Sequence, residues 1–314
     1  MSATGALVKG PALDEWLTGL LWGWSHRGKG DRAMGMADLL VHVGQSRAAE
    51  ARLDAAVRLA QSCGARLTLL GLAPEPYLAS AVGIHMPPEL LHQLAAEARA
   101  EAERVVAQAV ARVASAVPAE GHALTARAEE LPGLLAWHAR RADLVMVGQP
   151  DPDNPQDPGQ AFVEAAFMAS GRPALVIPYI GTRGPMPPTR AIVAWDGSHE
   201  AARAVHDALP LLVKADQGVS LVVVDPDRLA GGLGARPGAD MAAHLARHGV
   251  RVEVVIVPSG GLSVADVLLD RAVDEGAGLL VMGGYGHARL REVVLGGTTR
   301  RILQQMTVPV LFSH

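Results

Sequence analysis

Apolar residues recur along the chain in short continuous runs, separated by Ala/Arg-rich segments with a helical period. Typical runs are Leu39–Val43, Leu67–Leu72, Asp143–Gly148 and Val219–Val224. The runs do not alternate between polar and apolar residues, as expected for parallel strands that helices cover on both faces. Each half of the chain contains five such runs with helical patterns between them. We therefore predict an α/β fold of two tandem open five-stranded parallel sheets with helices on both faces.

The two halves repeat one pattern. Ser46 and Ser198 each follow a first apolar run, and their separation is 198 − 46 = 152 residues. Pro74 and Pro226 each follow a second run, and 226 − 74 is again 152. A register that persists across a whole helix indicates an internal duplication.

Later in the chain the separation between corresponding residues of the two halves is smaller. Gly148 corresponds to Gly283, at 283 − 148 = 135 residues, so the first half carries 152 − 135 = 17 extra residues. They lie in or near a long helical pattern over about 88–117. A Gly/Pro-rich stretch, 181–189, separates the halves and is typical of a linker. The predicted organisation is an N-terminal extension at 1–36 (with Met34 or Met36 as an alternative start), a degenerate domain at 37–180, the linker at 181–189 and a second domain at 190–314.

Composition narrows the possible functions. Apolar residues make up 49% of the chain and charged residues 19%, which excludes a disordered protein. The net charge of −4 argues against a nucleic-acid or anionic-membrane partner, because both need a concentrated positive field. No apolar run reaches the ~18 residues of a membrane-spanning helix. The single cysteine, Cys63, excludes an internal disulfide. We expect a soluble cytoplasmic protein.

Candidate chemistry lies at the carboxyl ends of the second-half strands, where open parallel sheets bind ligands. Asp196 follows the first strand, and Gly283 and Gly286 follow the fourth. Gly296, Gly297, Thr298 and Thr299 then directly precede a predicted helix, Arg300–Met306. Glycines let backbone N–H groups approach an anion, a helix start adds unpaired donors, and threonine hydroxyls can cap the helix. The pattern predicts a phosphate site.

The spacing Gly283-x2-Gly286-x9-Gly296, the Val-Ala-Trp-Asp-Gly-Ser start at 193–198 and the closing Val-Pro-Val-Leu at 308–311 resemble the universal stress protein family. Both halves match that domain outline over about 37–314. The resemblance implies a Rossmann-like fold similar to that of the adenine nucleotide alpha hydrolases, with the strand order 3-2-1-4-5 in each half. It also implies that the halves pack as an intramolecular pseudo-dimer through Ala174–Pro178 and Pro309–Ser313. The resemblance implies binding of ATP or AMP, with or without Mg²⁺, in the second half. It implies that an aspartate and a valine hold the adenosine and that the glycine loop holds the phosphates. The implied site is Asp196, Val223, Met282, Gly283, Gly286, Gly296, Gly297, Thr298 and Thr299.

The sequence departs from the family pattern at several positions. Gly297 stands where the family usually has Ser or Thr, so a backbone donor remains but a hydroxyl does not. In the first half, Gly44 replaces the adenosine-contacting aspartate and Asp151 replaces the second glycine. The first-half loop, 150–158, carries three aspartates that repel phosphate and four prolines that lack an N–H donor. We predict that only the second half binds nucleotide.

Alternatives remain open at the level of the sequence. The glycines could be turn residues of an empty fold, and Asp196 could serve only to cap the helix that begins near Ser198. The chain would then be a scaffold that binds no nucleotide and acts through oligomerisation, for which a homodimer is one form.

His244 and His248 are interpreted as a surface pair, and no metal site is expected. No residue stands out as a general base, so we expect at most the slow ATP hydrolysis that the resemblance implies, and an ATP-using enzyme is a third alternative. The sequence does not identify a protein partner.

Overall fold

The computed structural model of the chain describes residues 35–75, 88–154, 159–182, 184–228, 236–285 and 297–314. The chain divides into two compact units, Met1–Gly35 and Met36–His314. Only Gly35 of the first unit is among the described residues, so the architecture below is that of the second unit.

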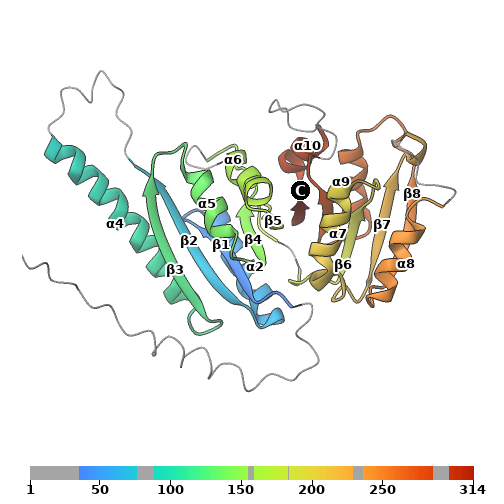
Figure 1. Ribbon diagram of the computed structural model, residues 1–314, viewed down its shortest axis with the longest axis horizontal. Helices are drawn as coiled ribbons and strands as arrows, with labels where there is room; N and C mark the ends of the chain where they lie inside the picture. Colours follow the sequence, from blue (N-terminus) through green and yellow to red (C-terminus); the bar gives the residue numbers. More distant parts are fainter. Residues whose placement is uncertain (1–34, 76–87, 155–158, 183, 229–235, 286–296) are drawn as a thin grey trace, which may run out of the picture. The chain divides into compact units, whose positions relative to one another are not determined.

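The described elements follow the strand–helix alternation that the sequence predicts (Figure 1). The first half contains β1 (Asp38–Val43), α2 (Arg47–Cys63), β2 (Arg66–Pro74), α4 (Pro88–Val113), β3 (Ala119–Ala126), α5 (Leu131–Ala139), β4 (Leu144–Gly148), α6 (Gly159–Glu164), the π-helical turn η2 (Ala165–Ala169) and β5 (Ala174–Ile177). The second half contains β6 (Arg190–Ala194), α7 (His199–Leu212), β7 (Gly218–Val224), the 3₁₀ turn η3 (Pro226–Arg228), α8 (Ala239–Arg247), β8 (Val252–Val257), α9 (Val264–Asp274), β9 (Leu280–Gly283), α10 (Gly297–Gln305) and β10 (Val310–Ser313).

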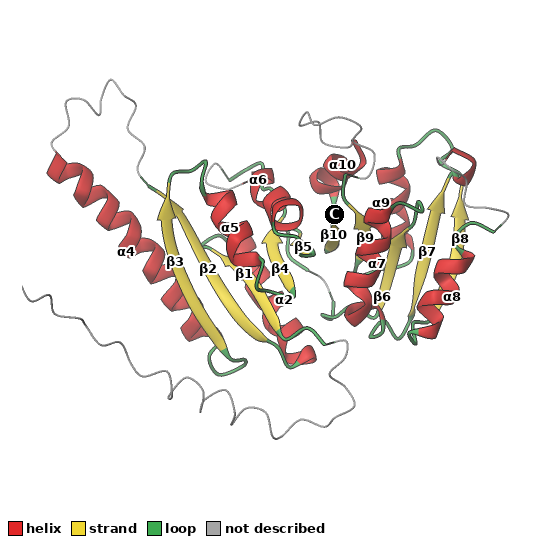
Figure 2. Cartoon of the chain, in the orientation of Figure 1, coloured by secondary structure: helices red, strands yellow, loops and turns green. Residues whose placement is uncertain are grey.

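The strands form one sheet in the order β3-β2-β1-β4-β5-β10-β9-β6-β7-β8 (Figure 2). Within each half the strands are parallel, in the order 3-2-1-4-5. The α/β fold class predicted from the apolar runs is therefore confirmed. The two five-stranded arrays are continuous, however, because β5 and β10 pair antiparallel, with Val176 opposite Val310 and Ala174 opposite Phe312.

Two apolar cores cover the two faces of this sheet, and each runs through both halves. One lies under α2, α4, α7 and α8, and the other lies under α5, α6, η2, α9 and α10. Successive strand residues enter opposite cores: Leu39 and Val41 of β1 face the first, and Leu40 faces the second. Burial on both faces is the physical reason why the strands read as continuous apolar runs. Among the described helices, none is both long and apolar enough to cross a membrane.

Candidate functional site

The carboxyl ends of β6, β7 and β9 meet at one edge of the second half. Ala194 of β6 pairs with Val222 of β7, and Val193 pairs with Val281 of β9. In the β6–β9 register Gly283 is level with Trp195, so Asp196 lies one residue beyond that level, at the same end of the sheet. The chain order of the strands reverses between β6 and β9, which is where ligands bind in open α/β sheets. The Asp196–Gly283 edge is therefore the candidate site.

Asp196 is half-buried and belongs to the turn that starts α7. Its Oδ1 accepts a hydrogen bond from the backbone N–H of Ser198 at 2.9 Å. Gly197 between them has φ 78°, a left-handed conformation that favours glycine. The N-cap of α7 is Ser198, whose Oγ accepts from the N–H of Ala201 at 3.1 Å. The interpretation of Asp196 as the helix cap is therefore wrong in its detail, because Ser198 caps the helix and Asp196 fixes the turn before it.

Gly283 at the end of β9 is partly exposed and lies directly against the first turn of α7. A Cβ atom at this position would lie 2.6 Å from the backbone nitrogen of Ala201 and 2.7 Å from Cβ of Glu200. Contacts this short do not occur in real structures, so only glycine allows α7 to pack here. The tight packing of α7 thus provides a structural reason for Gly283, whatever ligand the edge accepts.

Glu200 is a buried acidic residue at this edge that the sequence analysis missed. The residue is 4% exposed, and its Oε1 lies 2.8 Å from Nε2 of the exposed His199. Its Oε2 is buried without a hydrogen-bond partner. The position in the first turn of α7 suits a carboxylate, because the helix dipole is positive there. An acidic residue two positions after a serine N-cap was the available signal, but burial could not be inferred from it.

Two further predicted site residues, Val223 and Met282, lie in the interior. Val223 of β7 is 0% exposed, and its Cγ2 would be 3.3 Å from a Cβ atom on Gly238. Met282 of β9 is 6% exposed and packs in the core under α9 and α10. The structure does not bring their side chains to the surface of the Asp196–Gly283 edge, so any contact of theirs with a ligand at this edge would be through the backbone.

The glycine loop is described only at its two ends. Gly286 and Gly296 lie outside the described residues. After them, α10 already begins at Gly297, three residues earlier than predicted. Gly297 is exposed, Thr298 is half-buried and Thr299 is 3% exposed. The expectation that Thr298 and Thr299 precede the helix is thus corrected: both lie in its first turn, and Thr299 faces the interior because the apolar face of α10 begins there.

Gly284 and Tyr285 continue the chain from β9, and sequence reasoning did not identify Tyr285 as a structural residue. The Gly284 N–H donates to the carbonyl of Ser313 at 2.9 Å, and its own carbonyl lies 3.0 Å from Nδ1 of His314. Tyr285 is 8% exposed and has φ 65°, which is uncommon for a residue with a side chain. This turn is therefore held on both sides: by the end of β10, and by Phe167 and Glu164 of the first half.

In the first half, the edge equivalent to the Asp196–Gly283 edge is covered by the side chain of Arg52. Arg52 is 6% exposed, and its Nε donates to the carbonyl of His42 at 2.7 Å. The Arg52 guanidinium lies over Gly148, so closely that a Cβ atom there would collide with Nη1. The offset of 152 places Ala204 at the equivalent position of α7, where it is 0% exposed and carries no charged group. The two halves thus differ in what fills the space beside the fourth strand.

His42 of β1 lies in the same filled region. Its ring contacts that of Phe162 edge-on, with 4.9 Å between the centroids. Burial, reinforced by the charge of Arg52, lowers the pKa of His42 from 6.5 to about 3. The imidazole is therefore neutral at physiological pH. A neutral ring and a buried guanidinium make this edge unlike the Asp196–Gly283 edge.

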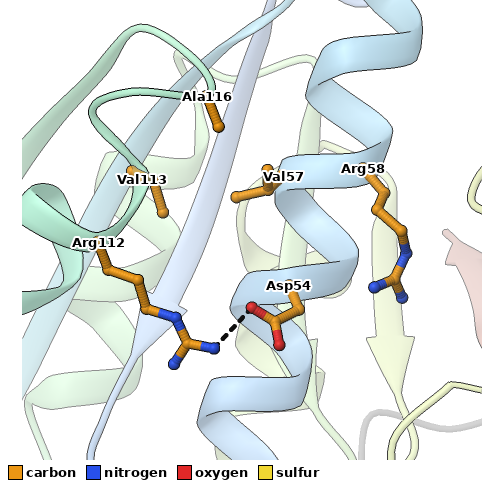
Figure 3. A pocket seen from close by; sticks show the side chains of 6 residues that line it. All are labelled: Asp54, Val57, Arg58, Arg112, Val113 and Ala116. Atoms are coloured by element: carbon orange, nitrogen blue, oxygen red, sulfur yellow. Dashed lines mark hydrogen bonds and ion pairs between the residues drawn. The ribbon is translucent and has the colours of Figure 1, made fainter.

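Cavities and metal-ligating groups elsewhere do not add a second candidate. A cavity of about 250 Å³ lies between α2 and α4, where Arg112 Nη2 bonds Asp54 Oδ1 at 2.8 Å and Arg58 extends away from that pair (Figure 3). A smaller one of about 170 Å³ lies at the amino ends of β1 to β3. Within the described ranges, no three His, Cys, Asp or Glu side chains are arranged to hold a metal ion.

Known proteins that are similar to this chain share its α/β fold. The structure is that of a Rossmann-like α/β protein with two five-stranded parallel arrays, and residues 188–314 match the universal stress protein family. A universal stress protein of Synechocystis is 30% identical over 129 residues, covering 39% of this chain and 42% of that protein, so the match spans less than half of the relative.

Solved structures extend the likeness to most of the chain. A universal stress protein from Archaeoglobus fulgidus has a TM-score of 0.66 at 15% identity and covers 88% of this chain and 97% of its own. A functionally unknown protein from Pseudomonas aeruginosa PAO1 has a TM-score of 0.56 at 15% identity, covering 89% and 93%. Identities this low show the fold alone. Residues 188–314 therefore contain a universal stress protein family domain, and the fold of most of the chain is similar to that of a solved universal stress protein.

Proposed function

We propose that the chain binds one adenine nucleotide, ATP or AMP, at the Asp196–Gly283 edge of the second half. The observation that carries the proposal is the difference between the two edges. The second half presents half-buried Asp196 and backbone at Gly283, with the first turns of α7 and α10 as donors. In the first half the Arg52 guanidinium lies against the equivalent glycine, Gly148, whereas Gly283 has only the first turn of α7 beside it. In this proposal nucleotide occupancy regulates an interaction of the protein during stress, and no catalytic residue is assigned.

Asp196 is the most specific element of the proposed site. A carboxylate at the end of a first strand can accept hydrogen bonds from ribose hydroxyls or the adenine amine. Its turn already holds it in place through Ser198 N–H. Asp196→Asn keeps an oxygen for that turn but loses the charge, so it separates ligand recognition from folding. Phosphate contacts would come from backbone N–H groups, and Mg²⁺ could accompany the phosphates of ATP.

Calorimetric titration tests the proposal directly. We expect one site per chain for ATP or AMP, weaker binding of GTP, and a loss of affinity of about tenfold in Asp196→Asn, equivalent to about 1.4 kcal/mol. The control is Ser46→Ala, which removes a helix cap at the carboxyl end of β1 in the first half and should leave affinity unchanged. Two equivalent sites would contradict the assignment to the second half.

The alternative function is a scaffold that binds no nucleotide. The burial of Val223 and Met282 favours it, because neither side chain is available to a ligand. Native mass spectrometry of freshly purified protein separates the two functions. A retained mass of an adenine nucleotide supports the proposal, and bare protein together with a flat calorimetric titration supports the scaffold.

A further inference from the structure

A helical segment of the first half, α6 with η2, contacts the turn that leaves β9 in the second half. Phe167 of η2 stacks on the ring of Tyr285, with centroids 5.6 Å apart and planes 13° apart. It also stacks on Phe312 of β10, at 5.4 Å and 21°. Phe167 and Phe312 are 1% and 0% exposed, so the three rings form a buried cluster shared by the two halves. Of the three residues, Tyr285 follows Gly283 by two positions and belongs to the turn that leaves β9.

Gly284 is shaped for this contact. A Cβ atom on Gly284 would lie 2.5 Å from Cε2 of Phe167 and 3.0 Å from its Cζ. No φ in the left-handed region requires glycine here, so the requirement comes from the approach of the Phe167 ring. The backbone directly after Gly283 is thus fitted to a side chain from the other half.

The conformation of Tyr285 needs support. Its φ of 65° is strained in a residue with a Cβ atom and persists only where the surroundings hold it. Two contacts from the first half do so: the stacked Phe167 ring, and Glu164, whose Oε1 accepts a hydrogen bond from the Tyr285 hydroxyl at 3.3 Å. Gln160 Nε2 donates to the same oxygen at 2.6 Å and so orients the carboxylate.

The hydroxyl of Tyr285 keeps its proton throughout the physiological range. Burial raises the pKa of Tyr285, and the charge of Glu164 and the hydrogen bond to it raise that pKa further. The hydroxyl therefore remains a donor to the carboxylate. The contact between Tyr285 and Glu164 is a permanent feature of the fold at ordinary pH.

A second contact ties the other end of the loop to the first half. Gln149, which follows β4, is 2% exposed, and its Nε2 donates to the carbonyl of Leu303 in α10 at 2.9 Å. Its Oε1 accepts from the N–H of Tyr179 at 3.2 Å. Both described flanks of the second-half loop, the Gly284–Tyr285 turn and α10, are therefore held by the first half.

We infer that Phe167 and Glu164 are positioning residues for the nucleotide site of the second half. They hold Tyr285 in its left-handed conformation and thereby fix the direction in which the backbone leaves Gly283. The inference rests on the proposed function. In this inference the first half does not bind nucleotide itself. Its residues instead fix the backbone conformation of the binding edge in the second half.

Paired substitutions in one helical segment test the inference. Phe167→Leu removes the ring that contacts the second half, and Phe162→Leu removes an equally buried ring that contacts His42 within the first half. Calorimetry with AMP and ATP should show affinity weakened about threefold to tenfold in Phe167→Leu and unchanged in Phe162→Leu. Thermal melts of both variants should show similar losses of stability, so lower stability alone cannot explain the difference.

Milder variants keep the test independent of folding. Tyr285→Phe removes only the hydroxyl, and Glu164→Leu removes only its acceptor; each should weaken nucleotide binding about threefold. Glu164→Gln keeps an acceptor oxygen and should restore wild-type affinity. Because coupling is reciprocal, AMP should also slow amide hydrogen exchange in 160–169 of the wild type, and less so in Phe167→Leu.

The outcomes separate the two proposals. If the wild type binds no nucleotide, the proposed function fails, and the positioning role fails with it. If the wild type binds and the variants Phe167→Leu, Tyr285→Phe and Glu164→Leu bind equally well, the positioning role alone is overturned. Equal weakening in Phe162→Leu and Phe167→Leu would also overturn it, because the effect would then be general to the core.

Discussion

Ser46 and Ser198 cap two helices in the same way, although they lie 198 − 46 = 152 residues apart. Each has φ −71°, with ψ 155° and 162°, and each Oγ accepts from the backbone N–H three residues later at 3.1 Å. An N-cap serine satisfies one of the unpaired donors at a helix start. The register of apolar runs and the geometry of the caps thus agree residue by residue.

The caps should contribute equally to stability. Ser46→Ala and Ser198→Ala should each lower the free energy of unfolding by about 1 kcal/mol, measured by urea denaturation. Ser62→Ala provides the control, because the Ser62 hydroxyl donates to Leu59 O at the end of α2 and caps no free N–H. A cap variant as stable as the wild type would contradict the assignment of that serine.

Gly283 should contribute to the stability of the fold, whether or not a ligand binds. Gly283→Ala places a methyl group against the backbone of Ala201, and such overpacking should lower the free energy of unfolding by about 1–3 kcal/mol. Gly133→Ala in α5 meets nothing within 4 Å and should be neutral, or stabilising by up to about 1 kcal/mol. Melting curves of the two variants compare these effects. Equal midpoints would show that α7 can move away from β9.

His42 should make the protein sensitive to acid. The unfolded chain binds a proton at this imidazole below pH 6.5, whereas the folded protein binds it only near pH 3. The free energy of unfolding is therefore unaffected by this imidazole above pH 6.5. Between pH 6.5 and about pH 3 it falls by up to about 1.4 kcal/mol per pH unit. Denaturation of His42→Gln at pH 7, 6, 5 and 4 should give a flatter dependence than the wild type. His92→Gln, at an exposed position of α4, should keep the wild-type slope.

Gln149 should stabilise the folded protein, because its side chain joins the two halves. Gln149→Leu leaves Leu303 O and Tyr179 N–H without their partner, and unpaired buried polar groups cost about 1–3 kcal/mol each. We expect a clear drop in the urea midpoint. Gln61→Leu, on the exposed side of α2, should change stability by less than about 0.5 kcal/mol. If the two variants unfold alike, the contact between Gln149 and α10 is not a stabilising one.

Much of the fold could be predicted because its signals are local. Runs such as Leu67–Leu72 indicate buried strands, and the serines at 46 and 198 indicate helix starts. The helix α10 begins three residues before the position that the sequence predicts, because threonine at 298 and 299 suits a cap as well as a first turn. The site residues were harder to judge: burial of Glu200, Val223 and Met282 depends on elements distant in the chain.

By itself, the sequence determined the α/β class, the parallel strands of each half and the resemblance to universal stress proteins, because these follow from short-range periodicity and motif spacing. Only the tertiary structure decided why particular residues stand where they do. Gly283 admits α7, Gly284 admits Phe167, and Arg52 fills the edge of the first half. Such contacts depend on side-chain shape and on the pairing of β5 with β10, and close packing across the sheet leaves no trace in local patterns.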